Sequence, residues 1–463
     1  MNAPIAIDAY FDGLRRREFA RLDAHDCAYL DYTGSALHGA SQVEAQARLL
    51  ADGVFGNPHS EHRPSRHSAA LIDAARRAVL TWFNVDENSH AVCFVANASA
   101  AIKLVAEAYP FSARRGLMLS ADNHNSVNGI REFARRAGAT IGTIPLDMQL
   151  RLQDPLAQLG AASASGPGLF AFPAQSNFSG VRHPLGLVAS ARDRGWDVLL
   201  DAAAYAPSSR LDLGRCGADF TAISFYKMFG LPTGIGALIA RREALARLRR
   251  PWFAGGTVDY ASVQLDRHRL IGGEQAYEDG TPNFLGIGMI SVGLDFIAAI
   301  GSERLSRRLR ELTACFIDGL VALRHPCGSP LVRLYGPEDS RDRGATVAFN
   351  VLDAQGRALP FLEVEQRAGA AGVAMRGGCF CNPGCAESAF GFPGNAVAGC
   401  LDRLGDAFSI PRFAACLGSG IPVGALRASF GAPTNLRDIE RALGVIASFA
   451  ESGARRRTAS RRA

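Results

Sequence analysis

Two side chains with complementary chemistry each follow a short apolar run. One run, Val198 to Leu200, ends at Asp201, and a second, Phe220 to Phe225, is followed by Tyr226 and Lys227. Such runs are typical of buried parallel strands, and sites in open α/β sheets gather at the carboxyl ends of the strands. An acid and a lysine brought together there suggest pyridoxal phosphate (PLP), with the lysine attached to the cofactor and the aspartate paired with its pyridinium nitrogen. A structural ion pair is the alternative interpretation.

A helix start upstream could hold the phosphate group of such a cofactor. Ala98 and Ser99 lie between a predicted strand and a predicted helix, where unpaired backbone N–H groups and a partial positive charge favour an anion. Ser224 and Tyr226, beside the lysine, could add phosphate contacts. An ordinary helix cap at Asn97 explains this helix start equally well.

His124 and Asn177 each follow a predicted strand and could face the same cofactor. His124, in the segment SADNHNSVNG, could lie flat on the pyridine ring, although a histidine in a loop is more often solvated. Asn177, in FAFPAQSNFSG, could hydrogen-bond the phenolic oxygen of the cofactor or the substrate. As an isolated asparagine in a turn it would mean little.

Three cysteines, Cys379, Cys381 and Cys385, lie close together in the Gly/Pro-rich stretch MRGGCFCNPGCAE. A structural zinc site usually needs a fourth ligand at a recognisable spacing, and none is obvious nearby, so we expect no metal. Inert thiols are a second interpretation. The third is a nucleophilic cysteine on a loop, because exposure beside Arg376 would help to lower the pKa of a thiol and favour the reactive thiolate.

The elements expected around these residues alternate along the chain. Strands are predicted at 91–96, 117–122 and 168–175, and helices at 99–109 and 186–195, before the two strands that end at Asp201 and Lys227. Repeated βα units of this kind indicate a mixed or parallel sheet covered by helices on both faces.

The pattern changes after about Phe284, where long helices are followed by short strands such as 345–353 and by a last helix. Two domains are the natural expectation for 463 residues. We expect an N-terminal helical segment at 1–28 that packs near the small domain, a large domain at 29–290, a small domain at 291–450 and a basic disordered tail at 451–463.

Composition is that of an ordinary soluble enzyme, 48% hydrophobic and 20% charged, with a formal net charge of +6. Much of that charge comes from five arginines at 454–463, and such a tail is usually a solvated end, so we expect no nucleic-acid partner. No apolar run approaches a membrane span, and the N-terminus does not resemble a signal peptide. Ten cysteines in such a chain favour reduced thiols in the cytoplasm over a disulfide framework.

The order of these motifs resembles a known family. DNHNSV, SNFSG, LDAAAYAP, SFYKMFGLPTGIGAL and EDGTPNF together are similar to the class V aminotransferase group of fold-type I PLP enzymes, over about residues 28–450. Within this group the chain most resembles cysteine desulfurases and, through YLDYTGSAL, GNPHS, RGGCFCNPGC and ALRASFG, the N-terminal desulfurase domain of molybdenum cofactor sulfurases. The resemblance implies an α/β fold: a large domain with a mostly parallel seven-stranded sheet between helices, and a smaller α+β C-terminal domain.

The resemblance also implies roles for the residues above. Lys227 would bind PLP and shuttle protons, Asp201 would pair with the pyridinium, and His124 would stack on the ring. The phosphate would be surrounded by Ala98, Ser99, Ser224 and Tyr226. Family members are dimers, and Thr281 matches a threonine that reaches the phosphate of the neighbouring subunit, so we expect a homodimer.

Three positions depart from related patterns. Ala204 stands where Suf-type desulfurases have a glutamine next to the cofactor, and Tyr226 replaces a histidine of those enzymes. Both differences favour the cofactor-sulfurase branch. Gly377 stands where threonine is usual, which is a minor departure.

The resemblance also assigns a reaction. Cys381 matches the persulfide-forming cysteine, and Cys379 and Cys385 match accessory cysteines. Arg427, which could otherwise be a surface charge, matches the guanidinium that clamps the substrate carboxylate with two parallel hydrogen bonds, helped by Asn177. The expected enzyme takes sulfur from L-cysteine, leaves L-alanine and holds a persulfide on Cys381 for an acceptor protein or small molecule, with molybdenum cofactor among the candidates. Another class V reaction (β-lyase, selenocysteine lyase, epimerase or aminotransferase) and a non-catalytic sulfur-relay or metal-binding scaffold are the alternatives.

Overall fold

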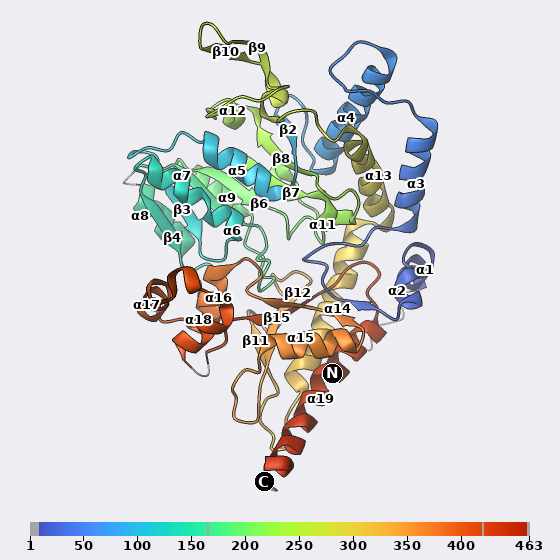
Figure 1. Ribbon diagram of the computed structural model, residues 1–463, viewed down its shortest axis with the longest axis vertical. Helices are drawn as coiled ribbons and strands as arrows, with labels where there is room; N and C mark the ends of the chain where they lie inside the picture. Colours follow the sequence, from blue (N-terminus) through green and yellow to red (C-terminus); the bar gives the residue numbers. More distant parts are fainter. Residues whose placement is uncertain (1–8, 164–165, 419–420, 461–463) are drawn as a thin grey trace.

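Seven strands form the central sheet of the larger domain (Figure 1). The computed structural model describes residues 9–163, 166–418 and 421–460. β8 is antiparallel to both of its neighbours, and the remaining pairs are parallel. The predicted seven-stranded, mostly parallel sheet is therefore confirmed. In sheet order the strands are β2 (His90–Val95), β8 (Gly236–Arg241), β7 (Phe220–Ser224), β6 (Asp197–Asp201), β5 (Leu169–Pro173), β3 (Leu117–Ser120) and β4 (Ile141–Ile144).

Helices cover both faces of this sheet, because successive strand residues point to opposite sides. In β6, Val198 and Leu200 join one apolar core and Leu199 joins the other. The first core includes side chains of α4 (Arg63–Trp82), α8 (Pro155–Ser163), α9 (Gly186–Arg192), α10 (Leu213–Cys216), α11 (Phe225–Phe229) and α13 (Phe284–Ile300). The second includes side chains of α5 (Ala98–Ala108), α6 (Asn125–Asn128), α7 (Ile130–Arg136) and α12 (Arg242–Leu245). α3 (Ala40–Asp52) lies against α13 (Figure 1).

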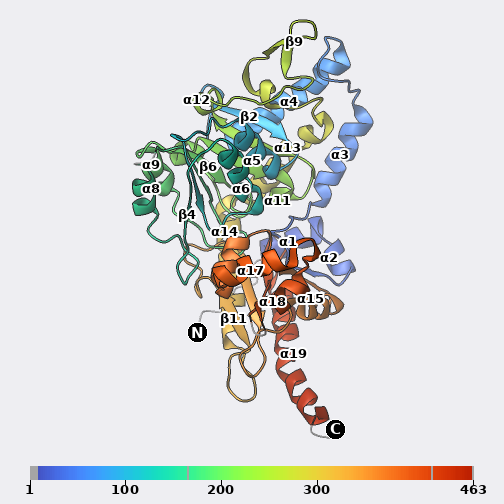
Figure 2. The same ribbon diagram turned by 60° about the vertical axis from the view of Figure 1, so that its left-hand side comes forward.

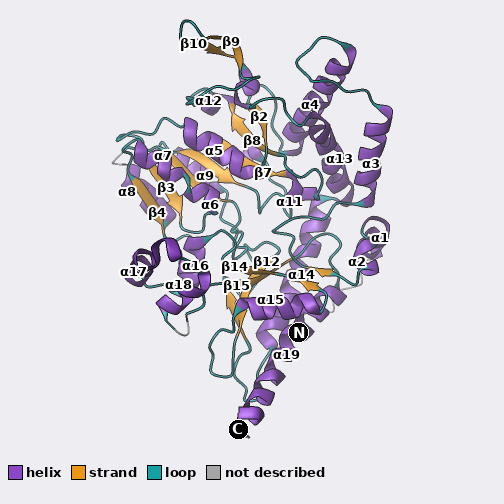
Figure 3. Ribbon diagram, viewed as in Figure 1, coloured by secondary structure: helices purple, strands orange, loops and turns teal. Residues whose placement is uncertain are grey.

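A second, antiparallel sheet forms the smaller domain (Figure 3). Its order is β11 (Val332–Tyr335), β12 (Thr346–Val351), β15 (Ala425–Ser429) and β14 (Arg376–Gly378). Side chains of α14 (Ser302–Ala322), α15 (Phe361–Ala370) and α19 (Leu436–Ser460) contribute to its apolar core. The smaller domain is thus α+β, as predicted.

The start of the described chain packs on the small domain. α1 (Ala9–Glu18), α2 (Arg21–Ala24) and the turn between them bury Phe11, Leu14, Phe19 and Leu22 in that domain's core. β1 (Ala28–Tyr29) then pairs in parallel with β13 (Val373–Ala374). The sequence analysis assigned residues just after 28 to the large domain. They lie on the small domain instead, because β1 pairs with β13, a strand far along the chain. Residues 1–8 lie outside the described part.

The two apolar cores divide close to Gly301. α13 contributes Ile287, Ile290 and Leu294 to the large-domain core, whereas α14 contributes to the small-domain core from Leu305 onward. Gly301, between the two helices, has a positive φ of 86°. The division falls about ten residues later than the predicted boundary of 290/291, because α13 continues to pack on α4 along its length.

The last helix is longer than expected. The backbone of α19 continues to Ser460, where the sequence analysis placed a disordered tail from residue 451. Alanine and arginine favour helix, which accounts for the extension. The final residues, 461–463, lie outside the described part. Among the described residues no single helix has the length and apolarity needed to cross a membrane; one pair, α13 with α14, meets that test only jointly and is bent by 69°.

A helical segment follows the cysteine loop and contains a disulfide. α16 (Pro383–Phe390) is followed by α17 (Gly394–Leu404), the short turn η2 (Gly405–Ala407) and α18 (Ile410–Leu417), and Figure 2 shows α17 and α18 together beside the small domain. Cys400 and Cys416 form a disulfide there, with their Cα atoms 5.9 Å apart. The expectation of reduced thiols throughout is therefore wrong for this pair, because the two helices pack side by side and bring together cysteines sixteen positions apart.

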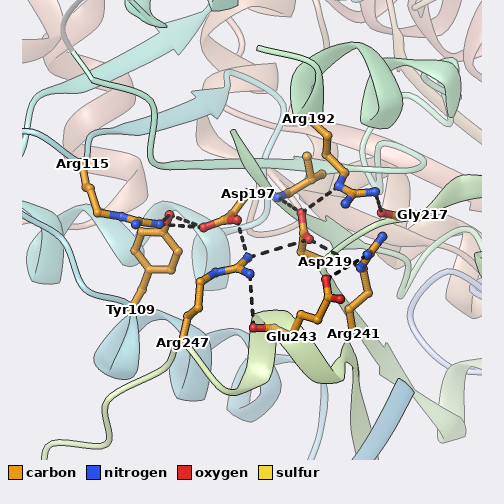
Figure 4. Close-up of polar contacts among 10 residues, drawn as sticks. Tyr109, Arg115, Arg192, Asp197, Gly217, Asp219, Arg241, Glu243 and Arg247 are labelled. Atoms are coloured by element: carbon orange, nitrogen blue, oxygen red, sulfur yellow. Dashed lines mark hydrogen bonds and ion pairs between the residues drawn. The ribbon is translucent and has the colours of Figure 1, made fainter. Parts of the chain in front are cut away.

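Two structural features lie far from the cysteine loop. A hairpin of β9 (Val258–Ser262) and β10 (Arg267–Leu270) projects from the large domain (Figure 1), followed by η1 (Gly273–Tyr277). At the amino ends of β6 and β7, Asp197 and Asp219 lie among several arginines (Figure 4). Arg247 reaches both carboxylates, at 2.5 Å and 4.0 Å. This network lies at the amino ends of the two strands. Asp201 and Lys227 lie at the opposite, carboxyl ends.

Candidate active site

A cavity of about 160 Å³ lies where β5, β6 and β7 end. Its walls come from the large domain, at the carboxyl edge of the sheet where sites of α/β proteins are expected. Eight residues proposed from the sequence as cofactor contacts line it: Ala98, Ser99, His124, Asn177, Asp201, Ser224, Tyr226 and Lys227.

Asp201 and Lys227 are delivered to this cavity by neighbouring strands. Asp201 is the last residue of β6 and accepts a hydrogen bond from the N–H of Ala203 at 2.9 Å. Lys227 lies in α11, which begins directly after β7. Burial lowers the pKa of Lys227, and the Asp201 carboxylate opposes that shift only in part. The amine is therefore neutral more often than an exposed lysine, which suits attack on an aldehyde.

Hydroxyl groups gather where α5 begins. Asn97 caps this helix by accepting from the N–H of Ala100 at 3.0 Å, and the N–H of Ala98 donates to Ser224 Oγ at 2.9 Å. The hydroxyls of Ser99 and Ser126 are 2.5 Å apart. A helix N-terminus ringed by three serines presents the donors that a phosphate group needs. Ser126 was not predicted, since its place opposite Ser99 is set by the tertiary fold.

His124 lines the cavity and also begins a helix. Its Nδ1 accepts from the N–H of Ser126 at 3.1 Å, so the imidazole caps α6. Burial lowers the pKa of His124, although the Asp201 carboxylate pulls it the other way. A neutral, fixed imidazole in the cavity wall fits the predicted stacking role.

The side chain of Asn177 is engaged by the cysteine loop. Its Nδ2 donates to the carbonyl of Phe380 at 2.7 Å, and its Oδ1 accepts from Asn382 Nδ2 at 2.9 Å. The residue lines the cavity as expected, but both ends of its amide have partners outside it. Asn177 therefore joins the cavity to the residues around Cys381.

The three loop cysteines occupy different environments. Cys381 is exposed. Cys379 donates to the carbonyl of Val423 at 3.1 Å, and burial raises its pKa to about 11. Cys385 is fully buried, 4.0 Å from Ser176 Oγ, and burial raises its pKa far above the usual range. Cys381 is therefore the most exposed of the three loop thiols. No cluster of three or more metal-ligating side chains is found among the described residues.

Arg427 is buried in β15 and not on the surface. Its NH1 donates to the carbonyl of Asn177 at 3.0 Å, and its NH2 donates to Asp31 Oδ1 at 2.8 Å. The guanidinium lies over the Phe380 ring, with its carbon 4.7 Å from the ring centroid. Its Nε is buried without a hydrogen-bond partner among the described residues. A buried donor without an acceptor is costly, so an arriving carboxylate would satisfy it.

Asp31 is a site residue that the sequence analysis did not name. Its second oxygen, Oδ2, accepts from Arg376 at 2.9 Å and 2.7 Å. The Arg376 guanidinium, expected to act on a loop thiol, is therefore paired with Asp31. One carboxylate thus links the arginine of β15 with the arginine of β14. Arg376 lies five positions before Cys381, in the strand that leads into the loop. No local signal in YLDYTGSAL marks this role.

Thr281 does not line the cavity. Its hydroxyl accepts a hydrogen bond from Asn57 Nδ2 at 3.1 Å in an exposed part of the large domain. Its predicted contact with a neighbouring subunit's phosphate involves a second chain and stays a prediction. Asn382, which the sequence analysis also left out, carries a signal in hindsight: asparagine followed by proline is a helix-start pattern.

The donor set fits PLP. An ionisable amine of lowered pKa and a carboxylate face one cavity, an imidazole forms its wall, and hydroxyls surround a helix N-terminus. These groups match, in order, the aldehyde, the pyridine nitrogen, the ring face and the phosphate of the cofactor. The residues that would hold it are Lys227, Asp201, His124, Ser99 and Ser224.

Fold and site together are those of the class-V aminotransferase family of proteins. The model of that family, aminotransferase class-V, matches residues 28–441, and the chain belongs to this family.

Curated relatives narrow the comparison. The chain is 34% identical to a molybdenum cofactor sulfurase of Solanum lycopersicum over 486 aligned residues, covering 96% of this chain and 58% of the relative. It is also 34% identical to the molybdenum cofactor sulfurase of Homo sapiens over 470 residues, covering 94% of this chain and 50% of that protein. The chain thus spans only about half the length of these relatives.

Solved structures share the fold. A cysteine desulfurase of Thermococcus onnurineus superposes with a TM-score of 0.79 at 24% identity, covering 97% of this chain and all of that one. The cysteine desulfurase CsdA of Escherichia coli superposes with a TM-score of 0.75 at 21% identity, covering 96% and 98%. At these identities the structures establish the fold alone.

Proposed function

We propose that this protein is a PLP-dependent cysteine desulfurase, which converts L-cysteine to L-alanine and keeps the sulfur as a persulfide on Cys381. One observation carries the proposal. Asn177 lines the cavity that holds Lys227 and also donates to the carbonyl of Phe380, the residue before Cys381. The residue next to the exposed thiol is therefore hydrogen-bonded to the wall of a cavity that fits the cofactor. The names of relatives and fold neighbours, molybdenum cofactor sulfurase and cysteine desulfurase, support the same reaction.

The cavity residues would divide the work at the substrate's α-carbon. PLP bound there supplies an electron sink for the charge that develops when Cα loses its proton. Asp201 keeps the pyridine nitrogen protonated, and the amine of Lys227 removes and returns the proton at Cα. Arg427 binds the substrate carboxylate, using the Nε that lacks a partner in the described structure.

The sulfur step belongs to Cys381. Its thiolate attacks the sulfur of L-cysteine, an S–S bond forms, and the C–S bond of the substrate breaks. The electron pair of that bond stays on the substrate carbon, which takes a proton and leaves as alanine. Cys381 keeps the sulfur as a persulfide and passes it to an acceptor, a protein or small molecule, with molybdenum cofactor among the candidates.

The wider setting belongs to the proposal as well. A nucleophilic thiol works where thiols stay reduced, which favours the cytoplasm. The proposed assembly is a homodimer, in which Thr281 faces the partner's cavity. No nucleic acid or membrane takes part in the proposed reaction.

Product analysis separates this reaction from other class V reactions, because desulfuration leaves alanine whereas β-elimination leaves pyruvate. We expect the purified protein, supplied with PLP, to release alanine from L-cysteine. Lys227→Ala should lower turnover by roughly 10²–10⁴-fold, since it removes the proton-transfer group. It should also abolish the bond to PLP that borohydride reduction fixes in the wild type, which is detected by mass spectrometry of the peptide. Pyruvate as the main product, or undiminished alanine from the variant, would reject the assignment.

A further inference from the structure

The backbone at the proposed nucleophile is strained. Phe380 and Cys381 both have φ near 55°, in the left-handed region, and neither is glycine. Each such residue costs on the order of 1–2 kcal/mol relative to ordinary backbone. A loop with two of them in succession would relax unless neighbouring contacts hold it.

Asn382 supplies the contacts that hold this loop. Its side chain is completely buried. Nδ2 donates to Asn177 Oδ1 at 2.9 Å and to the carbonyl of Asp122 at 2.6 Å, while Oδ1 accepts from the N–H of Cys385 at 3.2 Å. Both amide hydrogens and the amide oxygen are therefore used.

Each partner is itself fixed to the large domain. Asp122 follows β3, is completely buried, and its Oδ2 lies 2.8 Å from His183 Nε2. The N–H of Asn125 donates to the carbonyl of Cys381 at 2.7 Å, which is a second attachment beside Asn382. The loop belongs to the small domain, but its strained residues are bonded to groups at the ends of large-domain strands.

We propose that Asn382 is a positioning residue for Cys381. Its two donated hydrogen bonds keep Phe380 and Cys381 in the left-handed conformation and hold the Cys381 thiol against the cavity. This inference rests on the proposed desulfurase reaction, since it concerns the thiol that accepts sulfur. Asn382 acts through Cys381 and does not touch the substrate.

The rival role for Asn382 is that of a helix cap. It precedes Pro383, the first residue of α16, and its Oδ1 binds the N–H of Cys385. Aspartate caps helices about as well as asparagine, but it has no N–H to donate. Asn382→Asp therefore keeps the cap and turns the contacts with Asn177 and Asp122 into oxygen–oxygen repulsions. Asn382→Ser also keeps a capping oxygen and is too short to reach those partners.

The test compares two substrates of the PLP-loaded enzyme. L-Cysteine needs Cys381 to take its sulfur. L-Cysteine sulfinate does not, because its sulfur leaves as sulfur dioxide when the C–S bond breaks, and the carbon is protonated to alanine. We expect Asn382→Asp and Asn382→Ser to lower alanine formation from L-cysteine by 10–100-fold, the effect of misplacing a reacting group by about 1 Å. Alanine formation from the sulfinate should stay within twofold of the wild type.

A second readout is independent of turnover. Hydrogen–deuterium exchange of the peptide covering residues 376–390 should become faster in both variants, while peptides of β6 and β7 stay protected. Equal losses of alanine formation on the two substrates would show that Asn382 supports folding in general. A wild-type rate with L-cysteine in Asn382→Asp would show that Asn382 serves only as a helix cap. Either result overturns the proposal. If the wild type itself releases pyruvate or puts no sulfur on Cys381, the desulfurase assignment fails instead.

Discussion

Arg427 already has a carboxylate beside it before any substrate arrives. Asp31 shares its two oxygens between Arg427 and Arg376, so the single negative charge of this carboxylate offsets only one of the two positive charges. A substrate carboxylate would supply the second negative charge and leave Asp31 paired with Arg376. Arg376 begins the strand that leads to the cysteine loop. Asp31 therefore connects Arg427, the proposed carboxylate-binding residue, with that loop.

The three loop thiols should differ in how their reactivity depends on pH. A pKa of about 11 for Cys379 leaves about one molecule in a thousand as thiolate at pH 8, and each unit of higher pH raises that fraction about tenfold. We expect iodoacetamide at pH 8 to label the exposed Cys381 first. Labelling of Cys379 should accelerate about 100-fold between pH 8 and pH 10, and Cys385 should stay unlabelled. Tandem mass spectrometry of the loop peptide measures this, and equal labelling of Cys379 and Cys381 at pH 8 would contradict it.

At the residue scale, the sequence indicated which residues belong to the candidate site better than it indicated which residues they contact. Lys227, Asp201 and His124 could be proposed from the sequence because each follows a short apolar run or belongs to a family motif, and all three line one cavity. Asp31 and Asn382 were missed because their partners lie far away in the chain: Asp31 bonds to Arg427, and Asn382 bonds to Asn177 and Asp122. Single-sequence patterns carry no information on such pairs.

The two ends of β6 and β7 have different roles. β6 and β7 present Asp201 and Lys227 at one end, and their other ends are tied by the ion network of Figure 4. Asp219 is nearly buried there: its Oδ2 accepts from the N–H of Val198 at 2.9 Å and lies 3.6 Å from Arg192 Nε. Burial raises the pKa of Asp219, and the nearby arginines offset part of that effect.

Removing this carboxylate should destabilise the sheet. Asp219→Ala removes the acceptor of Val198 N–H and the carboxylate paired with Arg192, at a cost of about 3 kcal/mol. Asp219→Asn keeps the acceptor and should cost about 1 kcal/mol. The urea midpoint of unfolding measures both. Glu243→Ala is the matched control, since Glu243 pairs with Arg241 at an exposed position and should change stability by less than about 0.5 kcal/mol. A midpoint for Asp219→Ala equal to that of the control would contradict this account.

Elements were predictable where their pattern is local. The buried strands and the amphipathic helices around them follow from apolar runs and turn residues. The pairing of β1 with β13 and the Cys400–Cys416 disulfide were not predictable, because each joins segments that only the tertiary fold brings together.

The whole molecule places its cavity where the two domains meet. The large domain supplies the cavity walls, and Phe380 and Arg427 of the small domain are hydrogen-bonded to Asn177 in that wall. This division accounts for the tight bonding of the loop across the boundary, through Asn177, Asn125 and Asp122. Family resemblance predicted the two-domain plan, and the exact boundary at Gly301 depended on how α13 packs.

A homodimer is the assembly we expect. Sedimentation equilibrium of the PLP-loaded protein should give twice the chain mass of 49.2 kDa. Thr281 should then lie at the subunit contact, so its peptide should exchange amide hydrogens more slowly than in a monomeric variant. A monomer at assay concentrations with full turnover would refute a role for Thr281 across subunits.

The central claim is that Cys381 accepts sulfur from L-cysteine. Its most direct measurement is mass spectrometry of the loop peptide after the PLP-loaded protein has been incubated with L-cysteine and trapped by alkylation. We predict one added sulfur atom on Cys381, none on Cys379 or Cys385, and none anywhere in the loop of Cys381→Ser. Added sulfur on another loop cysteine, or alanine formation that continues undiminished in Cys381→Ser, would contradict the account.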